Sequence, residues 1–309
     1  MTEEMLPVTE EMLSVTKEPL PRLRWRCPVC GGDLSVLPED KRYACEKRHS
    51  FDIARQGYVN LLLPQKRGSQ QPGDSPDMVR ARSGFLEGGY YEGFSDGVNA
   101  LCLDALRSEN KTSAALADAG CGEGYYTVRL CRALSENGIS AHLAGFDLAR
   151  DAVLRGAKRA NAAGYAKEVT FAAASLFEMP LQDASLDGVV NLFAPTSDAE
   201  FARVLRPGGF LLLAVPAEEH LWGFKAALYD HPYKNEVRRD VLPHFTLSEI
   251  RRVSYDITLR TPEDIGNLFL MTPYYWKTSV SDREKLSRLE TLQTEVSFDL
   301  LLYRRGKED

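Results

Sequence analysis

The stretch L-A-D-A-G-C-G-E-G-Y-Y-T, Leu116 to Thr127, decides the fold of this 309-residue chain. Small apolar residues run up to Asp118, a glycine-rich turn follows, and a helical pattern begins at Tyr125. A strand, a tight glycine turn and a helix build nucleotide-type sites at the carboxyl edge of an α/β sheet, because glycine lets the backbone approach a ligand closely. The loop alone does not separate a cofactor site from an ordinary strand-to-helix turn, since such a motif depends on its context.

The context comes from the apolar runs that follow. Leu143–Asp147 ends in an acid and predicts a second strand, with Asp147 placed to accept hydrogen bonds from ribose hydroxyls. Val169–Ser175 and Ser185–Pro195 predict a third and a fourth strand. An R-P-G-G turn, Arg206–Gly209, precedes the apolar run of a fifth.

This series resembles the class I S-adenosylmethionine-dependent methyltransferases over residues 114–216. The form G-C-G-E-G and the R-P-G-G turn are habits of that family, whereas dinucleotide-binding dehydrogenases carry G-x-G-x-x-G. The resemblance implies an α/β chain with the class I Rossmann-like methyltransferase fold, whose last strands form an antiparallel edge.

We expect the cofactor's amino-acid end at the glycine loop, its ribose at Asp147, and its adenine against Leu148 and the end of the third strand. By resemblance, Tyr91 and His220 also reach the cofactor, although a lone histidine is more often a packing or surface residue. The predicted cofactor residues are Tyr91, Asp118, Gly120, Gly122, Glu123, Gly124, Asp147, Leu148, Ala174, Ser175, Asn191 and His220.

No residue identifies itself as a catalytic base. Methyl transfer needs mainly the positioning of two reactants, because the cofactor carries its own leaving group. Asn191 and Phe193 lie where the fourth strand ends and are the catalytic candidates. The sequence N-L-F-A-P departs from the N/D-P-P-Y-type turn of many base methyltransferases, so the catalytic group stays open.

A second strong signal lies near the N-terminus, at Cys27, Cys30, Cys45 and His49. The two short pairs, C-x2-C and C-x3-H, have the spacing of a tetrahedral zinc site, and the segment between them reads as a hairpin. Four protein ligands leave no open position, so we expect a structural Zn²⁺, one per chain. So short a segment needs the metal to fold, and we expect its core to be separate from that of the larger domain.

With this N-terminal block the resemblance narrows to the zinc-containing 23S rRNA guanine-N1 methyltransferases. The residues that carry it are the Cys3His knuckle, then H-S-F-D-I-A-R-Q-G-Y-V-N-L-L, P-G-D-S-P-D-M-V-R-A-R, F-L-E-G-G-Y-Y and D-A-G-C-G-E-G-Y-Y-T. The family methylates one of two nearby guanines in a 23S rRNA hairpin near the peptide exit tunnel, and some members protect producers of macrolides such as tylosin. The resemblance also implies an rRNA or large-subunit precursor as partner, a homodimer, and antibiotic resistance as a consequence to be tested.

Composition fits a soluble cytoplasmic protein. Hydrophobic residues make up 44% and charged residues 27%, which is ordinary for a globular chain. No apolar run approaches the roughly 20 residues that span a bilayer, and no signal peptide is visible. Three of the six cysteines crowd beside a histidine, which favours metal ligation in a reducing compartment over disulfides.

The net charge of −6 argues mildly against a nucleic-acid partner, but the charge is unevenly distributed. Residues 22–82 hold 12 Lys/Arg against 7 Asp/Glu, so this basic third is the expected phosphate track. Its candidate contacts are Arg42, Lys47, Arg48, Lys66 and Arg67.

The predicted organisation has four parts. Residues 1–23 are a disordered extension with a tandem heptad, 24–63 the zinc-binding domain, 64–110 a linker loop and helices, and 111–309 the methyltransferase domain. Helices are expected over Pro76–Ala105, broken at G-G-Y-Y, and over Thr261–Trp276. A charged helical stretch is expected after Lys225, followed by a strand at Val253–Arg260 and a late strand from Ser297.

Two alternatives remain open at this point. A methyltransferase fold without catalysis would serve as an RNA- or protein-binding module, which the intact Asp118 loop and Asp147 argue against. A small-molecule methyltransferase would have no use for the knuckle and its basic flank. The aromatic cluster Pro273–Trp276 reads either as packing or as a stacking wall for an extruded guanine.

Overall fold

The computed structural model describes residues 20–37, 39–63, 74–237 and 241–306. The tandem heptad, Lys66 and Arg67 lie outside these ranges, so the expectations that rest on them stay predictions.

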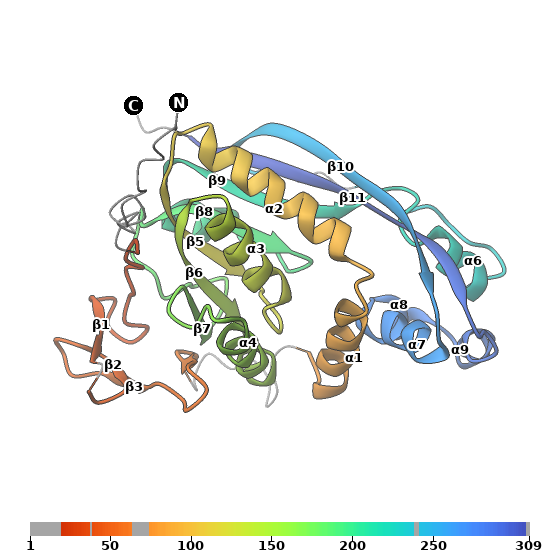
Figure 1. The fold of residues 1–309 in the computed structure, drawn as a ribbon, viewed down its shortest axis with the longest axis horizontal. Coiled ribbons are helices and arrows are strands. Elements are labelled where there is room, and N and C mark those ends of the chain that lie inside the picture. Colours follow the sequence, from red (N-terminus) through yellow and green to blue (C-terminus); the bar gives the residue numbers. More distant parts are fainter. Residues whose placement is uncertain (1–19, 38, 64–73, 238–240, 307–309) are drawn as a thin grey trace, which may run out of the picture.

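A mixed sheet of eight strands forms the body of the molecule, in the order β10-β11-β9-β8-β5-β6-β7-β4 (Figure 1). The strands from β4 to β9 run parallel to their neighbours, and β11 and β10 are added antiparallel at one edge. The predicted methyltransferase architecture and its antiparallel edge are confirmed. The strand bounds are β4 Val59–Asn60, β5 Ser113–Ala119, β6 Ser140–Asp147, β7 Val169–Ala173, β8 Leu186–Leu192, β9 Leu205–Pro216, β10 Phe245–Leu259 and β11 Leu292–Arg305.

Both faces of this sheet are covered, as the alternation along β5 shows. Ala114 and Leu116 belong to the apolar cluster shared with α2, α3 and α4, whereas Ala115, Ala117 and Ala119 belong to the opposite cluster. Successive side chains of a strand point to opposite faces, so the nearly continuous apolar run of β5 is the mark of a strand buried on both sides. The helices are α1 Pro76–Glu87, α2 Glu92–Arg107, α3 Tyr125–Glu136, α4 Arg150–Ala163, α5 Asp198–Val204, α6 Trp222–Leu228, α7 Pro262–Met271, α8 Tyr274–Lys277 and α9 Val280–Leu286.

The predicted pair of helices around G-G-Y-Y is confirmed as α1 and α2. Ser75 caps α1 by accepting a hydrogen bond from the Met78 N–H at 3.3 Å, and Pro76 occupies its first turn. The predicted helix after Thr261 is α7, and the late strand is β11.

The expected charged helix after Lys225 is wrong. Within the described part of residues 229–244 no helix forms, and β10 already begins at Phe245. The physical reason is the buried Lys225, whose Nζ donates to the Tyr233 carbonyl at 2.9 Å and to Asn235 Oδ1 at 2.8 Å. The chain folds around this ammonium group because a buried charge needs such partners.

A small N-terminal ribbon, residues 24–63, lies at the opposite end of the molecule from α6 to α9 (Figure 1). Its antiparallel sheet has the strands β1 Leu34–Leu37, β2 Arg42–Cys45 and β3 Ser50–Asp52. The β1–β2 pair confirms the predicted hairpin.

The expectation that this ribbon has a core separate from the larger domain is wrong. Trp25 is buried, and its ring lies 5.5 Å from that of Tyr43 and 5.8 Å from that of Phe146 on β6. Trp25 also forms a β-bridge with Leu181. The chain that leaves the ribbon after β3 forms β4, which joins the large sheet beside β7. One apolar cluster therefore runs through both units.

Among the described residues, no helix is long and apolar enough to cross a membrane.

Candidate functional site

The four predicted metal ligands converge in the ribbon. The sulfur atoms of Cys27, Cys30 and Cys45 and a ring nitrogen of His49 lie within 4.8 Å of one another. Cys30 Sγ is 3.8 Å from Cys45 Sγ, and His49 Nδ1 is 3.5 Å from Cys27 Sγ and 3.4 Å from Cys45 Sγ. Metal bonds of about 2.3 Å to sulfur and 2.0–2.1 Å to nitrogen in a tetrahedron require separations of roughly 3.8 and 3.6 Å. The donor set fits one structural zinc ion.

Two backbone turns hold these ligands in place. In the first, the Gly31 N–H donates to the Cys27 carbonyl at 2.8 Å, and Gly31 has a φ of 75°. In the second, the Arg48 N–H donates to the Cys45 carbonyl at 2.8 Å, with Arg48 at a φ of 66°. The Gly32 N–H lowers the pKa of the Cys30 thiol to about 7. Such a thiol readily becomes the thiolate that a metal binds.

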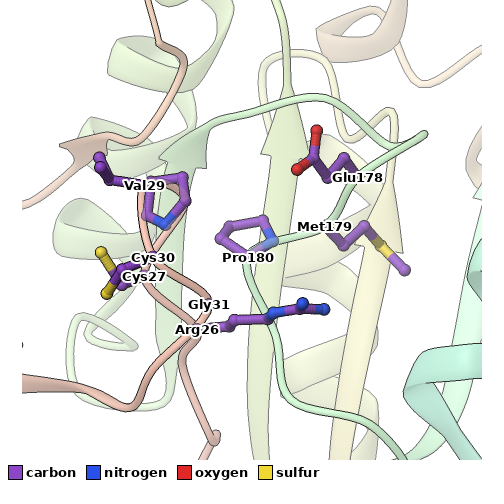
Figure 2. Close-up of a pocket in the computed structure, with 9 residues that line it drawn as sticks. Arg26, Cys27, Val29, Cys30, Gly31, Glu178, Met179 and Pro180 are labelled. Atoms are coloured by element: carbon purple, nitrogen blue, oxygen red, sulfur yellow. The ribbon is translucent and has the colours of Figure 1, made fainter.

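Behind the first turn, a cavity of about 320 Å³ separates the ribbon from the loop that follows β7 (Figure 2). Its floor is formed by Met179 and Pro180 of that loop and by Arg26. The sulfur atoms of Cys27 and Cys30 turn to the other side, away from Met179 (Figure 2). The metal cluster and this cavity therefore use different faces of the same turn.

The glycine loop lies at the carboxyl end of β5. The N–H groups of Gly120 and Cys121 both donate to the Phe146 carbonyl of β6, at 2.8 and 2.9 Å. A Cβ on Gly120 would lie 2.3 Å from the Cβ of Ala194, and the φ of Gly120 is 88°. Glycine is therefore needed at this position both for its backbone conformation and for the close approach of the loop after β8.

Asp147 fastens this loop to the end of β6. Its Oδ2 accepts from the Gly122 N–H at 3.0 Å, and its Oδ1 accepts from the Ala149 N–H at 2.8 Å. The Asp147 carbonyl accepts from the Ala174 N–H at 3.1 Å, which brings the end of β7 to the same edge. Leu148 follows, half-buried, and Ser175 Oγ accepts from the Phe177 N–H at 3.2 Å. The predicted ribose and adenine residues are thus neighbours.

Two further acids are buried beneath the loop. Asp118 accepts from the Thr127 hydroxyl, and burial raises the pKa of its carboxyl to about 7. Glu123 is 1% exposed, and burial raises its pKa as well. Its Oε1 has no hydrogen-bond partner among the described residues. A buried polar atom of this kind requires explanation, and a bound ligand is one.

Tyr91 and His220 form a buried pair next to this edge. His220 Nδ1 accepts from the Ser297 N–H at 3.2 Å, and the Tyr91 hydroxyl lies 3.4 Å from His220 Nε2. Burial lowers the pKa of His220 to about 3, so the ring is neutral. With Nδ1 accepting, its single proton lies on Nε2 and points to the Tyr91 oxygen. The Tyr91 hydroxyl is then left to donate elsewhere.

The two catalytic candidates lie at the end of β8. Asn191 is buried, and its Nδ2 donates to the carbonyls of Ala119 at 2.8 Å and Pro195 at 3.3 Å. These two acceptors fix the amide orientation and turn its oxygen the other way. An amide cannot serve as a base, so Asn191 holds the ends of β5 and β8 together and offers an acceptor at most.

Phe193 has the strained left-handed conformation, with a φ of 59°. Its ring is 50% exposed and rests on Phe94 and Phe298, with centroids 5.2 and 5.0 Å away. Tyr91 completes this aromatic wall at 6.4 Å. Strain of this kind gathers at functional sites, and an exposed ring is a stacking surface.

The aromatic cluster predicted at 273–276 divides between packing and exposure. Tyr274 packs against Phe224 and Tyr229, and Tyr275 against Phe269 and the Arg283 guanidinium. Trp276 is 71% exposed. The packing alternative describes Tyr274 and Tyr275, whereas the role of Trp276 stays open.

Of the predicted phosphate contacts, Lys47 and Arg48 are exposed on the ribbon, and Arg42 pairs with Asp40 at 2.9 Å. Sequence reasoning missed Thr127, which binds the Asp118 carboxylate, and Arg82, which lies over Gly122. Both were inside quoted motifs. The helical period places Thr127 on the buried face of α3. Nothing in the sequence indicated that α1 packs where it brings Arg82 next to the glycine loop.

Comparison with known proteins agrees with this geometry. The family model described as "RlmA, N-terminal", a zinc ribbon, matches residues 25–70, and the model described as "Methyltransferase domain" matches residues 116–209. The chain is 32% identical to the 23S rRNA (guanine(748)-N(1))-methyltransferase of Streptomyces fradiae, over 85% of this chain and 88% of that one. It is 35% identical to a Micromonospora griseorubida protein assigned as a 23S rRNA (guanine-N1)-methyltransferase, over 65% and 68% of the two chains. A Bacillus subtilis protein with the same assignment, YxjB, is 28% identical over 90% and 96%.

Proposed function

The chain belongs to the family of 23S rRNA (guanine-N1)-methyltransferases, and on that premise we propose that it transfers a methyl group from S-adenosylmethionine to N1 of one guanine in 23S rRNA. The observation that carries the proposal is the union, in one chain, of a four-ligand ribbon and a methyltransferase glycine loop that share one core. The similarity to the relatives spans both units.

The cofactor would lie along the carboxyl edge of β5, β6 and β7. Its ribose hydroxyls would meet Asp147, its adenine would lie near Leu148 and Ala174, and its amino-acid end would meet the glycine loop. Three observations support this placement: the close backbone approach at Gly120, the carboxylate of Asp147 at the end of β6, and the unpartnered Oε1 of Glu123. When bound, S-adenosylmethionine supplies an activated methyl group and its own leaving group.

The protein then has to position the guanine and deal with the proton on N1. The exposed ring of Phe193 offers a stacking surface, and the buried amide of Asn191 keeps that surface close to the glycine loop. His220 is not the base, because its Nε2 carries the proton and its Nδ1 is bonded to the Ser297 N–H. Burial raises the pKa of Asp118 to about 7, but the Thr127 hydroxyl already donates to this carboxyl group beneath the loop.

The reactive edge of guanine is its Watson–Crick edge, which is occupied in a duplex. The base must therefore come from a loop or be extruded, and such bases are held by stacking plus phosphate contacts. In this proposal the ribbon supplies phosphate contacts through exposed cations such as Lys47 and Arg48. A homodimer with two ribbons around one RNA, and a site of action in the cytoplasm where rRNA is made, belong to the same proposal.

The test is methyl transfer from labelled S-adenosylmethionine to 23S rRNA, to naked rRNA and assembled large subunits in parallel. N1-methylguanine blocks Watson–Crick pairing, so reverse transcription stops at the modified nucleotide and identifies it. Label in free nucleosides or small molecules instead of rRNA would support a small-molecule methyltransferase. Tight RNA binding without any label would support a binding module.

The role of Asp147 has its own test. Asp147→Ala removes an acceptor for the ribose hydroxyls, and the loss of a charge-assisted hydrogen bond of about 1.5–3 kcal/mol weakens cofactor affinity roughly 10- to 100-fold. Asp147 also binds the N–H groups of Gly122 and Ala149. The affinities of the wild type and the variant for adenine and for adenosine are therefore measured by calorimetry. A ribose role reduces adenosine affinity alone, whereas a damaged loop reduces both.

A further inference from the structure

A basic side chain of α1, Arg82, lies beside the glycine loop, where several buried acids gather. A Cβ on Gly122 would lie 3.7 Å from Nη1 of Arg82, so the guanidinium of this α1 residue sits directly over the loop. Arg82 Nη1 forms an ion pair with Asp74 Oδ2 at 2.5 Å. Burial acts to lower the pKa of Arg82, but the ion pair with Asp74 and the attraction to Glu123 and Asp147 raise it overall, so the guanidinium keeps its charge.

Packing fixes the place of Arg82 above the loop. Val79, one turn earlier on α1, is buried against Ala149 and Ala152 at the start of α4. On the next turn, Glu87 accepts from Arg159 Nη2 at 3.1 Å. A helix fastened at both of these points holds the side chain between them in one position.

The loop itself carries a buried carboxyl group with an unpartnered oxygen, that of Glu123. Glu123 is 1% exposed, and its Oε1 is buried with no hydrogen-bond partner in the part of the chain that the structure describes. Glu123 follows Gly122 in the chain and Arg82 Nη1 lies beside Gly122, so the two charged side chains flank the same glycine, while Glu123 Oε1 has no partner among the described residues. A buried carboxylate without a partner costs free energy that a cationic ligand group would recover.

We infer that Arg82 binds the carboxylate of the cofactor's methionine moiety while Glu123 accepts from its ammonium group. This inference rests on the proposed use of S-adenosylmethionine. A methionine moiety is a zwitterion, and the two opposite charges of Arg82 and Glu123 match its two ends. Without Arg82, a ligand carboxylate would face Asp74, Asp118 and Asp147 and be repelled by them.

The test compares three ligands that differ only at this end. S-adenosylhomocysteine carries both charges, S-adenosyl-3-thiopropylamine lacks the carboxylate, and 5′-methylthioadenosine lacks the whole amino-acid end. By calorimetry, Arg82→Gln should weaken S-adenosylhomocysteine roughly 10- to 100-fold, the range for one charged hydrogen-bonded contact. The affinity for 5′-methylthioadenosine should not change. The affinity for S-adenosyl-3-thiopropylamine should not fall, because its ammonium group no longer lies near the positive charge of Arg82. Arg82→Lys should restore part of the lost affinity, since a point charge keeps the attraction without the fork.

Two matched variants separate ligand binding from support of the loop. Glu123→Gln should weaken the two amine-bearing ligands and spare 5′-methylthioadenosine. Arg159→Gln removes the bond to the Glu123 carbonyl and should affect all three ligands alike. If Arg82→Gln also weakens all three alike, Arg82 supports the loop and the inference is overturned. If the wild type binds none of the three, the proposed function itself fails, and that result is visible before any variant is made.

Discussion

The ribbon and the glycine loop are both short, turn-rich segments, but different forces hold them in shape. In the ribbon, the strands have three or four residues and the order comes from four ligand atoms within 4.8 Å of one another. In the glycine loop, the order comes from backbone hydrogen bonds to β6 and from packing too close for any side chain at Gly120. The two sites are therefore sensitive to opposite changes. The ribbon is disrupted by the loss of a ligand side chain, and the loop is disrupted by the addition of a side chain at Gly120.

The two regions are nevertheless joined by Trp25. Its ring contacts Tyr43 of the ribbon and Phe146 of the sheet, inside one apolar cluster. Loss of ribbon order is therefore expected to reach the sheet, and the predictions below test how far.

The largest effect should follow from loss of the metal. Cys45→Ser removes one of four ligands, and zinc-dependent folding of small domains is worth about 10–16 kcal/mol. We expect no bound zinc by metal analysis, loss of 23S rRNA methylation, and a lower unfolding temperature, because the cluster around Trp25 loses one side. Binding of S-adenosylhomocysteine should persist below that temperature, since the cofactor edge keeps its own contacts.

Cys131→Ser is the control, because this cysteine is also buried but lies on α3 outside the metal cluster. It should retain one zinc per chain. A Cys45→Ser protein with bound zinc and full rRNA methylation would show that the metal is dispensable to the ribbon.

The next effect concerns Trp25, which joins the ribbon to the sheet. Trp25→Ala removes a buried aromatic ring and should cost about 3–5 kcal/mol in the free energy of unfolding. Zinc should stay bound, because none of the four ligands changes, while rRNA methylation falls as the ribbon loses its fixed position. Val29→Ala, at a side chain 51% exposed on the turn that follows Trp25, should change stability by less than about 0.5 kcal/mol. Equal unfolding curves for the two variants would mean that the ribbon does not support the sheet.

Much of this comparison was predictable from the sequence. The ligand spacing predicted the cluster at Cys27 to His49. The methyltransferase fold with its antiparallel edge followed from a resemblance that local signals carry, namely the glycine loop and the R-P-G-G turn. The helix expected after Lys225 was wrong because Lys225 is buried and its Nζ binds the Tyr233 carbonyl and Asn235 Oδ1, contacts that depend on tertiary structure. The shared core was missed because Trp25 and Phe146 are 121 positions apart, and their contact depends on tertiary structure alone.

The candidate site divides in the same way. Asp147 follows a strand and was predictable as an edge residue, but its second task of fastening Gly122 was not. The role inferred for Arg82 could not be predicted, because it depends on where α1 packs, and contacts such as those of Val79 and Glu87 depend on tertiary structure.

A smaller effect should separate crowding from backbone strain in the loop. Gly120 and Gly138 both have positive φ, 88° and 76°, but only at Gly120 would a Cβ meet another atom, the Ala194 Cβ at 2.3 Å; at Gly138 nothing lies within 4 Å. Both Ala variants carry the strain of about 1–2 kcal/mol, and Gly120→Ala should cost about 1–3 kcal/mol more from overpacking. It should also abolish S-adenosylhomocysteine binding, whereas Gly138→Ala should bind normally. Equal urea midpoints would mean that the loop after β8 yields without cost.

The smallest effect concerns the pH dependence of stability. Each region has one histidine, His49 among the sulfur atoms of the ribbon and His220 at the cofactor edge, and the prediction concerns His220. Burial lowers the pKa of His220 from 6.5 to about 3, so below pH 6.5 the unfolded chain takes up a proton that the folded chain does not. The unfolded state then binds more protons, and stability is lost as pH falls from about 6.5 towards 3; at pH 5 the loss is about 2 kcal/mol.

His220→Asn keeps an acceptor for the Ser297 N–H but has nothing to titrate. It should therefore flatten this part of the profile, even though its stability at pH 7.5 is lower. Urea unfolding of both proteins from pH 7.5 to 5, with zinc present throughout, isolates this effect, since the metal site is the same in both and its contribution cancels in their difference. A difference that stays constant over this range would mean that His220 titrates near its ordinary pKa and is not the buried neutral ring that acceptance from the Ser297 N–H requires.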